Sequence, residues 1–249
     1  MRTIGIIPAR FASSRFPGKP LALIGDKSML RRVYERVRLS GVNEVIIATD
    51  DKRIANHAES FGAKIIMTSV KHNTGTERIE EAYRKLKKEY DIVINIQGDE
   101  PFIDPAHIRL LIKSFQQSDI DICTLADEFD SQNTLESSNS IKVVTDCKNN
   151  ALYFSRAVIP FQRDTEKSQW LTTYNYLKHI GVYAFRSEVL TKVVKLKPAE
   201  IEKAESLEQL RWIYSGYNIR VLKVKYYGVS VDTPDDLEKA NNILNEIYF

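Results

Sequence analysis

Short runs of Ile and Val alternate with amphipathic stretches along the first half of this chain. The β-branched runs predict buried strands, and apolar positions three and four apart predict helices between them. We expect strands at residues 3–8, 44–49, 64–67, 92–97 and 120–125, and helices at 28–38, 51–61, 76–86 and 105–117. Strands that alternate with helices in this way are typical of an α/β fold with a mostly parallel sheet.

The pattern changes after residue 126. Residues 127–140 are rich in Asp, Ser, Asn and Glu, which predicts an exposed loop. Residues 162–178 are polar, aromatic and poorly periodic, so we expect an arm that pairs with a second copy of the chain. The remaining segments predict strands at 141–145, 151–154, 179–185 and 219–225, and helices at 187–196, 207–215 and from Asp232 onward.

Composition excludes several classes of protein. The 249 residues carry 36 Lys and Arg against 33 Asp and Glu, and this near balance disfavours a dedicated nucleic-acid coat. The two cysteines, Cys123 and Cys147, are too few for a disulfide framework or a four-thiolate zinc site. The first residues do not resemble a signal peptide, and no apolar run is long enough to cross a membrane. We therefore expect a cytoplasmic protein that has no membrane or nucleic-acid partner.

The loop after the first predicted strand is the most informative segment. It places Arg10, Arg15 and Lys19 beyond the carboxyl end of that strand, where ligands bind in doubly wound sheets. Three cations suit a polyphosphate, and backbone amides near Ser14 form a nest for its oxygens. A solvated basic loop is the alternative. The loop lacks both the Walker A pattern and GxGxxG, so P-loop and nicotinamide chemistry are not expected.

Two aspartates are candidate magnesium ligands. Asp99 follows the strand predicted at 92–97, and Gly98 before it lets the backbone turn. Asp232 ends the apolar stretch before the last predicted helix. Carboxylates there suit Mg²⁺ when phosphates supply further oxygens. The alternative for each is a turn or helix cap.

A third segment, Thr74 to Arg78, opens a predicted helix after a loop. Helix N-termini attract anions, so we expect a nucleotide contact there, although Thr74 or Thr76 also suits a capping role.

Taken together, these motifs resemble those of the 3-deoxy-manno-octulosonate (Kdo) cytidylyltransferase family, the CMP-Kdo synthetases. The resemblance spans almost the whole chain, and its least similar parts are residues 127–140 and 162–178. The segments that carry it include Ile7-Pro8-Ala9-Arg10, Ser14 to Pro20, Ala48-Thr49-Asp50, Gly75-Thr76-Glu77-Arg78, Gln97 to Pro101, Ala151 to Arg156, His179 to Tyr183, Leu207 to Arg211 and Val231 to Pro234.

The resemblance implies a Rossmann-like nucleotidyltransferase that converts CTP and Kdo to CMP-Kdo and diphosphate for lipopolysaccharide biosynthesis. It implies that Asp99 and Asp232 hold Mg²⁺ and, with Arg10 and Lys19, form the catalytic set. The implied CTP contacts are Ala9, Arg10, Ser14, Arg15, Lys19, Thr74, Gly75, Arg78 and Gln97. The implied Kdo contacts are Gln97, Arg156, His179, Tyr183, Glu208 and Gln209.

The resemblance also implies a homodimer. We expect one domain over residues 1–249, with a nucleotide-binding part at about 1–139 and a sugar-binding and dimerisation subregion at about 140–190. Residues 191–249 return to the main sheet and supply sugar and metal residues.

Three alternatives remain open at this stage. One is a cytidylyltransferase for another sugar acid, such as 8-amino-Kdo or sialic acid, and another is a non-catalytic nucleotide-binding module. The third is a glycosyltransferase, whose Asp-x-Asp motif has a copy at Asp119-Ile120-Asp121. That copy precedes a predicted strand instead of ending one, which disfavours the third alternative.

Overall fold

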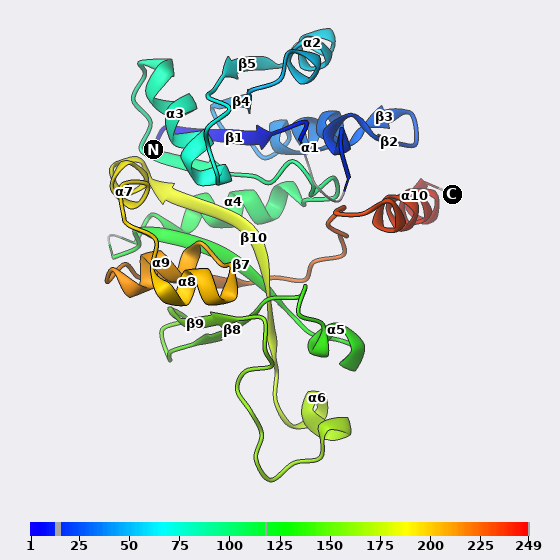
Figure 1. Ribbon diagram of the computed structural model, residues 1–249, viewed down its shortest axis with the longest axis vertical. Helices are drawn as coiled ribbons and strands as arrows, with labels where there is room; N and C mark the ends of the chain where they lie inside the picture. The colour runs from blue at the N-terminus through cyan, green and yellow to red at the C-terminus, as the bar shows by residue number, and fades with distance from the viewer. Residues whose placement is uncertain (13–15, 118, 249) are drawn as a thin grey trace. The chain divides into compact units, whose positions relative to one another are not determined.

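A computed structural model gives the fold, and it describes residues 1–12, 16–117 and 119–248, without the side chains of 245–248. The chain forms two compact units (Figure 1). Unit 1 contains Met1–Ile112 and Tyr226–Phe249, and unit 2 contains Lys113–Lys225. Unit 1 is therefore built from both ends of the chain.

A parallel sheet forms the centre of unit 1. Its strands are β1 (Thr3–Ala9), β4 (Glu44–Thr49), β5 (Lys64–Met67) and β6 (Ile92–Asn95), in the order β6-β1-β4-β5. In the register, Ile6 of β1 pairs with Ile46 of β4 and with Asn95 of β6. The strands that the sequence predicts in this part of the chain are confirmed, although β6 ends two residues early.

Among the described residues, five α-helices lie wholly or mostly in unit 1. They are α1 (Met29–Arg38), α2 (Lys52–Ser60), α3 (Gly75–Leu86), α4 (Pro105–Ser114, of which the last two residues belong to unit 2) and α10 (Pro234–Tyr248). Side-chain caps fix where the first three begin, because Ser28, Asp51 and Thr74 each accept a backbone N–H of the first turn. A short 3₁₀ helix, η1 (Lys19–Leu21), and a hairpin of β2 (Leu23–Ile24) and β3 (Lys27–Ser28) precede α1 and were not predicted.

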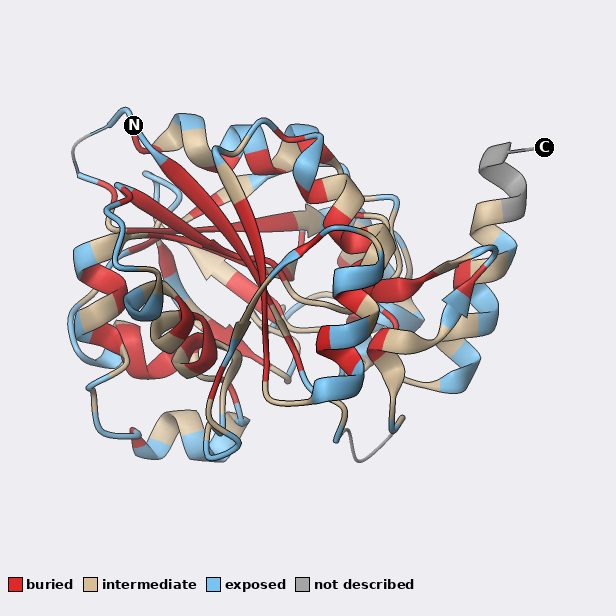
Figure 2. Ribbon diagram, turned by 90° about the horizontal axis from the view of Figure 1, so that it is seen from above, coloured by how far each residue is buried: buried red, intermediate tan, exposed pale blue. Residues whose placement is uncertain are grey.

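The core of unit 1 lies on both faces of this sheet, so its strands are apolar along their whole length. Ile4, Ile6 and Ile7 of β1 and Ile46 and Ile47 of β4 are fully buried. Figure 2 shows these strands in the buried colour, whereas the helices alternate between buried and exposed faces. Each such side chain contributes about 1.5–3 kcal/mol of hydrophobic stabilisation.

Unit 2 is a mixed sheet. β7 (Ile122–Glu128) pairs in parallel with β11 (Ile219–Lys223) and antiparallel with β10 (Leu177–Arg186). β8 (Lys142–Thr145) pairs with β10 and with β9 (Ala151–Ser155). The register between β10 and β7 shifts between Ile180 and Tyr183, which marks an irregularity of the β-bulge type. Its later helices are α7 (Ser187–Val193), α8 (Glu200–Glu205), which was not predicted, and α9 (Gln209–Tyr214).

Two segments of unit 2 have more structure than the sequence predicts. The loop expected at 127–140 contains the end of β7 and a short helix, α5 (Gln132–Glu136), capped by Ser131. Its Leu135 is fully buried and packs in a cluster with Phe129, Trp170 and Tyr176. That cluster also orders the predicted arm, which contains η2 (Lys167–Gln169) and α6 (Trp170–Thr173). The prediction of an exposed loop at 127–140 is therefore correct for most of its side chains, which are exposed or half-buried, but wrong for Phe129 and Leu135, which are buried, and for the residues of α5.

No helix in the described part of the chain is long and apolar enough to cross a membrane.

Candidate active site

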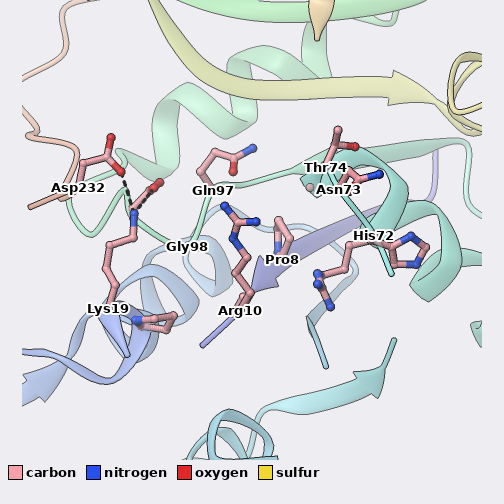
Figure 3. Close-up of a pocket in the computed structure, with 14 residues that line it drawn as sticks. Pro8, Arg10, Lys19, His72, Asn73, Thr74, Gln97, Gly98 and Asp232 are labelled. Carbon is pink, nitrogen blue, oxygen red and sulfur yellow. Dashed lines mark hydrogen bonds and ion pairs between the residues drawn. The ribbon is translucent and has the colours of Figure 1, made fainter. Parts of the chain in front are cut away.

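Unit 1 contains a cavity of about 380 Å³ beyond the carboxyl end of β1 (Figure 3). This is the edge of a parallel sheet at which ligands bind. Loops that follow β1, β5 and β6 supply most of its walls, and the segment before α10 closes them. The lining residues are Pro8, Ala9, Arg10, Lys19, Pro20, His72, Asn73, Thr74, Gly75, Arg78, Gln97, Gly98, Asp99 and Asp232.

Lys19 lies between the two predicted metal ligands. Its Nζ is 2.7 Å from Asp99 Oδ2 and 3.0 Å from Asp232 Oδ1, and its side chain is only 13% exposed. Figure 3 draws both contacts as dashed lines. Burial alone would lower the pKa of Lys19, but the charges and hydrogen bonds of the two carboxylates, led by Asp99, outweigh burial and raise the pKa. The lysine is therefore a fixed positive charge in the wall of the cavity.

A glycine with a left-handed backbone positions Lys19. Gly18 precedes η1 with φ +73°, and its N–H donates to the carbonyl of Phe11 at 2.9 Å. A Cβ at Gly18 would lie 3.2 Å from the ring of Phe11, so both the backbone angle and the space favour glycine. Pro20 then fixes the backbone of the short helix.

Asp232 reaches Lys19 because other residues cap the last helix. The carboxylate of Asp236 accepts the backbone N–H groups of Asp232 and Thr233, and Thr233 Oγ1 accepts the N–H of Asp236 at 3.3 Å. The capping role weighed for Asp232 thus belongs to Thr233. The apolar stretch before Asp232 was expected to be strand-like, but the structure, which describes that stretch in full, has no strand there. Instead, the N–H of Val231 donates to the carbonyl of Asp99 at 2.9 Å. That backbone bond brings the two aspartates together.

The donor set fits a magnesium ion in part. Two carboxylates converge on one cationic group, and carboxylate oxygens are the ligands that Mg²⁺ prefers. Across residues 1–12, 16–117 and 119–248 there is no group of three His, Cys, Asp or Glu side chains suited to hold a metal. A hard cation would therefore take its other oxygens from phosphates and water.

The turn that carries Asp99 packs closely against β1. Asp99 lies four residues after the end of β6, and a Cβ at Gly98 would stand 3.1 Å from the carbonyl oxygen of Pro8. Ala9 ends β1, and Figure 3 shows Arg10 extending from it toward Gln97. Arg10 and Gln97 both line the cavity, and their predicted contacts with CTP stay predictions.

The N-terminus of α3 also faces the cavity. Thr74 caps it in a reciprocal pair with Glu77, so the capping alternative applies to Thr74. Gly75 follows and lines the cavity. Arg78 lines it too, but its side chain is only 4% exposed, and its guanidinium donates to Asp50 at 2.8 Å and to Thr68 at 2.6 Å. In this structure Arg78 holds the ends of neighbouring strand loops together.

Some cavity residues and some predictions do not coincide. His72 and Asn73 line the cavity but have no predicted role, and their only signal in the sequence is their position directly before Thr74. Ser14 and Arg15 lie outside the described residues, so their predicted CTP contacts stay predictions.

Unit 2 carries five of the residues predicted to bind the sugar acid. Arg156 donates to three backbone carbonyls, of Glu205 at 2.7 Å, Ser138 at 2.8 Å and Ser206 at 3.4 Å. In this structure its guanidinium ties the end of α8 to the loop before β8. Its predicted role with a carboxylate stays a prediction.

His179 and Tyr183 are neighbours on β10, with ring centroids 5.3 Å apart, and Trp212 of α9 contacts the Tyr183 ring edge-on at 5.1 Å. Tyr183 Oη and Trp212 Nε1 are buried and have no hydrogen-bond partner among the residues that the structure describes. Burial first, and then the charge of Glu208, raise the pKa of Tyr183 well above its usual value. Two unpaired donors in a buried cluster are what a polar ligand would satisfy.

The other two sugar candidates begin α9. Gln209 is the first residue of the helix and is 6% exposed, and Glu208 precedes it without capping it through its side chain. A helix cap, the ordinary structural role of a Glu at this position, is therefore not the role of the Glu208 side chain.

A parallel α/β sheet whose carboxyl edge carries paired cations and carboxylates is the architecture of nucleotidyltransferases. At 40% identity and a TM-score of 0.92, the chain superposes on a solved CMP:2-keto-3-deoxy-manno-octonic acid synthetase complexed with CTP, over 99% of this chain and 100% of that one. The predicted fold class is confirmed. The chain belongs to the cytidylyltransferase family, whose model matches residues 4–221.

Individual relatives are similar over their full length. A 3-deoxy-manno-octulosonate cytidylyltransferase of Phocaeicola vulgatus is 48% identical over 250 residues, which cover 99% of this chain and 98% of the relative. The enzyme of that name from Porphyromonas gingivalis is 50% identical, over 95% of this chain and 94% of the relative. The predicted family resemblance is therefore confirmed.

Proposed function

We propose that this protein activates Kdo by transferring the cytidylyl group of CTP to it, which yields CMP-Kdo and diphosphate. The observation that carries the proposal is the Lys19, Asp99 and Asp232 cluster in a cavity at the carboxyl edge of a parallel sheet. Full-length similarity to proteins named for this activity supports it.

The reaction is an in-line displacement at the α-phosphorus. The anomeric hydroxyl oxygen of Kdo forms a bond to phosphorus while the bridging P–O bond breaks, diphosphate leaves with the electron pair, and the hydroxyl proton passes to solvent. Such reactions depend on positioning and on neutralising charge more than on covalent help.

The chain's own residues supply these functions. Lys19 and Arg10 place positive charge against the triphosphate, and the α3 N-terminus adds backbone N–H groups at Gly75. Asp99 and Asp232 hold Lys19 in place and are the residues that would hold Mg²⁺. When bound, Mg²⁺ neutralises phosphate charge and lowers the pKa of a coordinated hydroxyl.

We also propose that the protein acts as a homodimer in the cytoplasm. The dimer rests on the family resemblance stated above, and the location rests on the cysteine content, since the two cysteines are too few for a disulfide framework.

Diphosphate release tests the proposed function directly. CTP, UTP and dTTP are each combined with Kdo, 8-amino-Kdo or sialic acid in the presence of Mg²⁺. Release only with CTP and Kdo, abolished by a chelator, supports the proposal. Release with another sugar acid retains the nucleotide site and overturns the choice of sugar, and no release with any pair favours a nucleotide-binding module.

Variants of the two aspartates test the metal assignment. Asp99→Asn and Asp232→Asn each remove one anionic ligand, so we expect turnover to fall at least about 100-fold with the fold retained. Asp235→Asn is the matched control, because Asp235 is exposed in the first turn of α10. Turnover near that of the control in either variant would overturn the assignment of that aspartate.

A further inference from the structure

The imidazole of His179 is held by a buried threonine. His179 lies on β10 and Thr124 on the neighbouring β7, and Thr124 is fully buried. The two side chains meet at 3.0 Å between His179 Nε2 and Thr124 Oγ1. Which group donates in this bond depends on the tautomer of the imidazole, and the surroundings of Thr124 decide it.

Thr124 Oγ1 also lies beside two backbone carbonyls, at 2.8 Å from the oxygen of Val182 and 3.2 Å from that of Ile180. These carbonyls flank the register shift of β10, where the regular ladder with β7 is interrupted. A hydroxyl has a single hydrogen. If that hydrogen pointed at His179, the oxygen lone pairs would face two carbonyl oxygens at close range and repel them.

The hydroxyl hydrogen therefore points to a carbonyl, and Thr124 Oγ1 accepts a hydrogen bond from His179 Nε2–H. The imidazole is neutral under physiological conditions, because burial lowers the pKa of His179 to about 3. A neutral imidazole with a proton on Nε2 has a free lone pair on Nδ1.

Nδ1 is available to a ligand. Among the residues that the structure describes, none forms a hydrogen bond with Nδ1. The atom is also not fully buried, because it is absent from the fully buried side-chain atoms that have no hydrogen-bond partner. Phe154 contacts the ring edge-on at 5.0 Å and Tyr183 lies 5.3 Å away, so the ring cannot turn freely to exchange its two nitrogens.

From this geometry we infer that Thr124 is a positioning residue that fixes His179 as the Nε2–H tautomer, so that Nδ1 accepts a hydrogen bond from a hydroxyl of the sugar acid. The second half of this inference rests on the proposed function. The predicted sugar site then presents a hydrogen-bond acceptor at Nδ1 of His179. A hydroxyl can donate to this nitrogen, whereas an ether oxygen or a deoxy carbon cannot. An analogue methylated or deoxygenated at the hydroxyl that faces His179 should bind at least about 10-fold more weakly.

Nitrogen NMR of the full chain tests the tautomer without any turnover. Long-range ¹H–¹⁵N spectra of protein labelled at histidine, near neutral pH, should show a protonated Nε2 and an unprotonated Nδ1 for His179, assigned by its loss in His179→Gln. The opposite pattern, or a protonated ring, would overturn the tautomer assignment.

Two substitutions of Thr124 test the positioning role. Thr124→Val removes the hydroxyl and keeps the shape, so we expect both tautomers in the spectrum and an increase of about 10-fold in the KM for Kdo, with the KM for CTP unchanged. Thr124→Ser keeps the hydroxyl and should restore the Nε2–H pattern and the KM. Equal changes in both variants, or a wild-type tautomer in Thr124→Val, would overturn the role of Thr124.

The arms of the experiment separate the two ideas. If the valine variant does not fold, as judged by circular dichroism, the wild-type spectrum and the serine variant still decide the tautomer. If wild-type protein shows the Nε2–H pattern but releases no diphosphate with Kdo, the proposed function and the hydroxyl contact fail together while the tautomer assignment stands.

Discussion

Replacing Glu81 by Gln should destabilise the protein in a pH-dependent way. Glu81 of α3 accepts the backbone N–H of Ser69 at 2.8 Å and a hydrogen bond from His72 Nε2 at 2.5 Å, and it pairs with Lys85 at 2.7 Å. Burial alone would raise the pKa of Glu81, but these three groups together lower it from 4.5 to about 2. At 1.36 kcal/mol per pKa unit, this difference corresponds to about 3 kcal/mol of stability at neutral pH.

The sign of the pH dependence follows from the direction of the pKa change. A carboxyl group with a lower pKa in the folded state stabilises fully above its unfolded value of 4.5, and this contribution is lost as the pH falls toward about 2. At about pH 3.5 the unfolded chain binds the proton and roughly 1.4 kcal/mol of the advantage is gone. The gap between wild type and Glu81→Gln should therefore shrink from about 3 to about 2 kcal/mol.

Urea unfolding followed by circular dichroism at neutral pH and at about pH 3.5 measures both gaps. Glu59→Gln is the matched control, because Glu59 is an exposed helical glutamate of the same unit and should change stability by less than about 0.5 kcal/mol. A gap below about 1 kcal/mol for Glu81→Gln at neutral pH, or an equal gap at both pH values, would refute the reasoning.

Three further predictions concern the site and the cysteines. Gly98→Ala pushes a Cβ to 3.1 Å from the Pro8 carbonyl oxygen, so turnover should fall more than thermal stability, and an unchanged kcat would show that the turn has room to relax. Arg78→Met leaves a partly buried carboxylate without its ion pair and should cost about 3–5 kcal/mol in urea titrations, where a loss below about 1 kcal/mol would contradict the structural role. Iodoacetamide should label exposed Cys147 in the native protein but not Cys123, because burial raises the pKa of Cys123 to about 12. Mass spectrometry before and after unfolding identifies the labelled cysteine, and labelling of Cys123 before Cys147 would contradict the prediction.

The sequence predicts the parallel part of the fold well, because buried parallel strands are apolar along their whole length. Residues 3–8 and 44–49 show this pattern, and the structure has β1 and β4 there. The sequence predicts short elements poorly, because they contain too few residues for a hydrophobic pattern to repeat. The β2–β3 hairpin has two residues in each strand, and α5 depends on the burial of Leu135, which no local pattern reveals.

The candidate site shows the same limit. The positions of Asp99 and Lys19 follow from loops after predicted strands, and both residues line the cavity. Their ion pair joins residues 80 positions apart, and the one to Asp232 joins residues 213 positions apart, so neither is visible in local sequence. The contacts of Arg156 are equally hidden in the sequence. Its guanidinium donates to three backbone carbonyls, and their positions depend on the course of a loop and of a helix end.

Because unit 1 is built from both ends of the chain, the ribosome finishes its sheet long before it makes Asp232. During synthesis, unit 2 is translated in full before residues 226–249 emerge, so Lys19 has only one of its two carboxylate partners in that interval. Core residues before α10, such as Ile24 and Met29, also wait for Val231 and Ala240 to cover them. The order of synthesis thus delays completion of the cationic cluster until the last tenth of the chain, and a nascent chain halted in unit 2 would have a sheet without a finished active site.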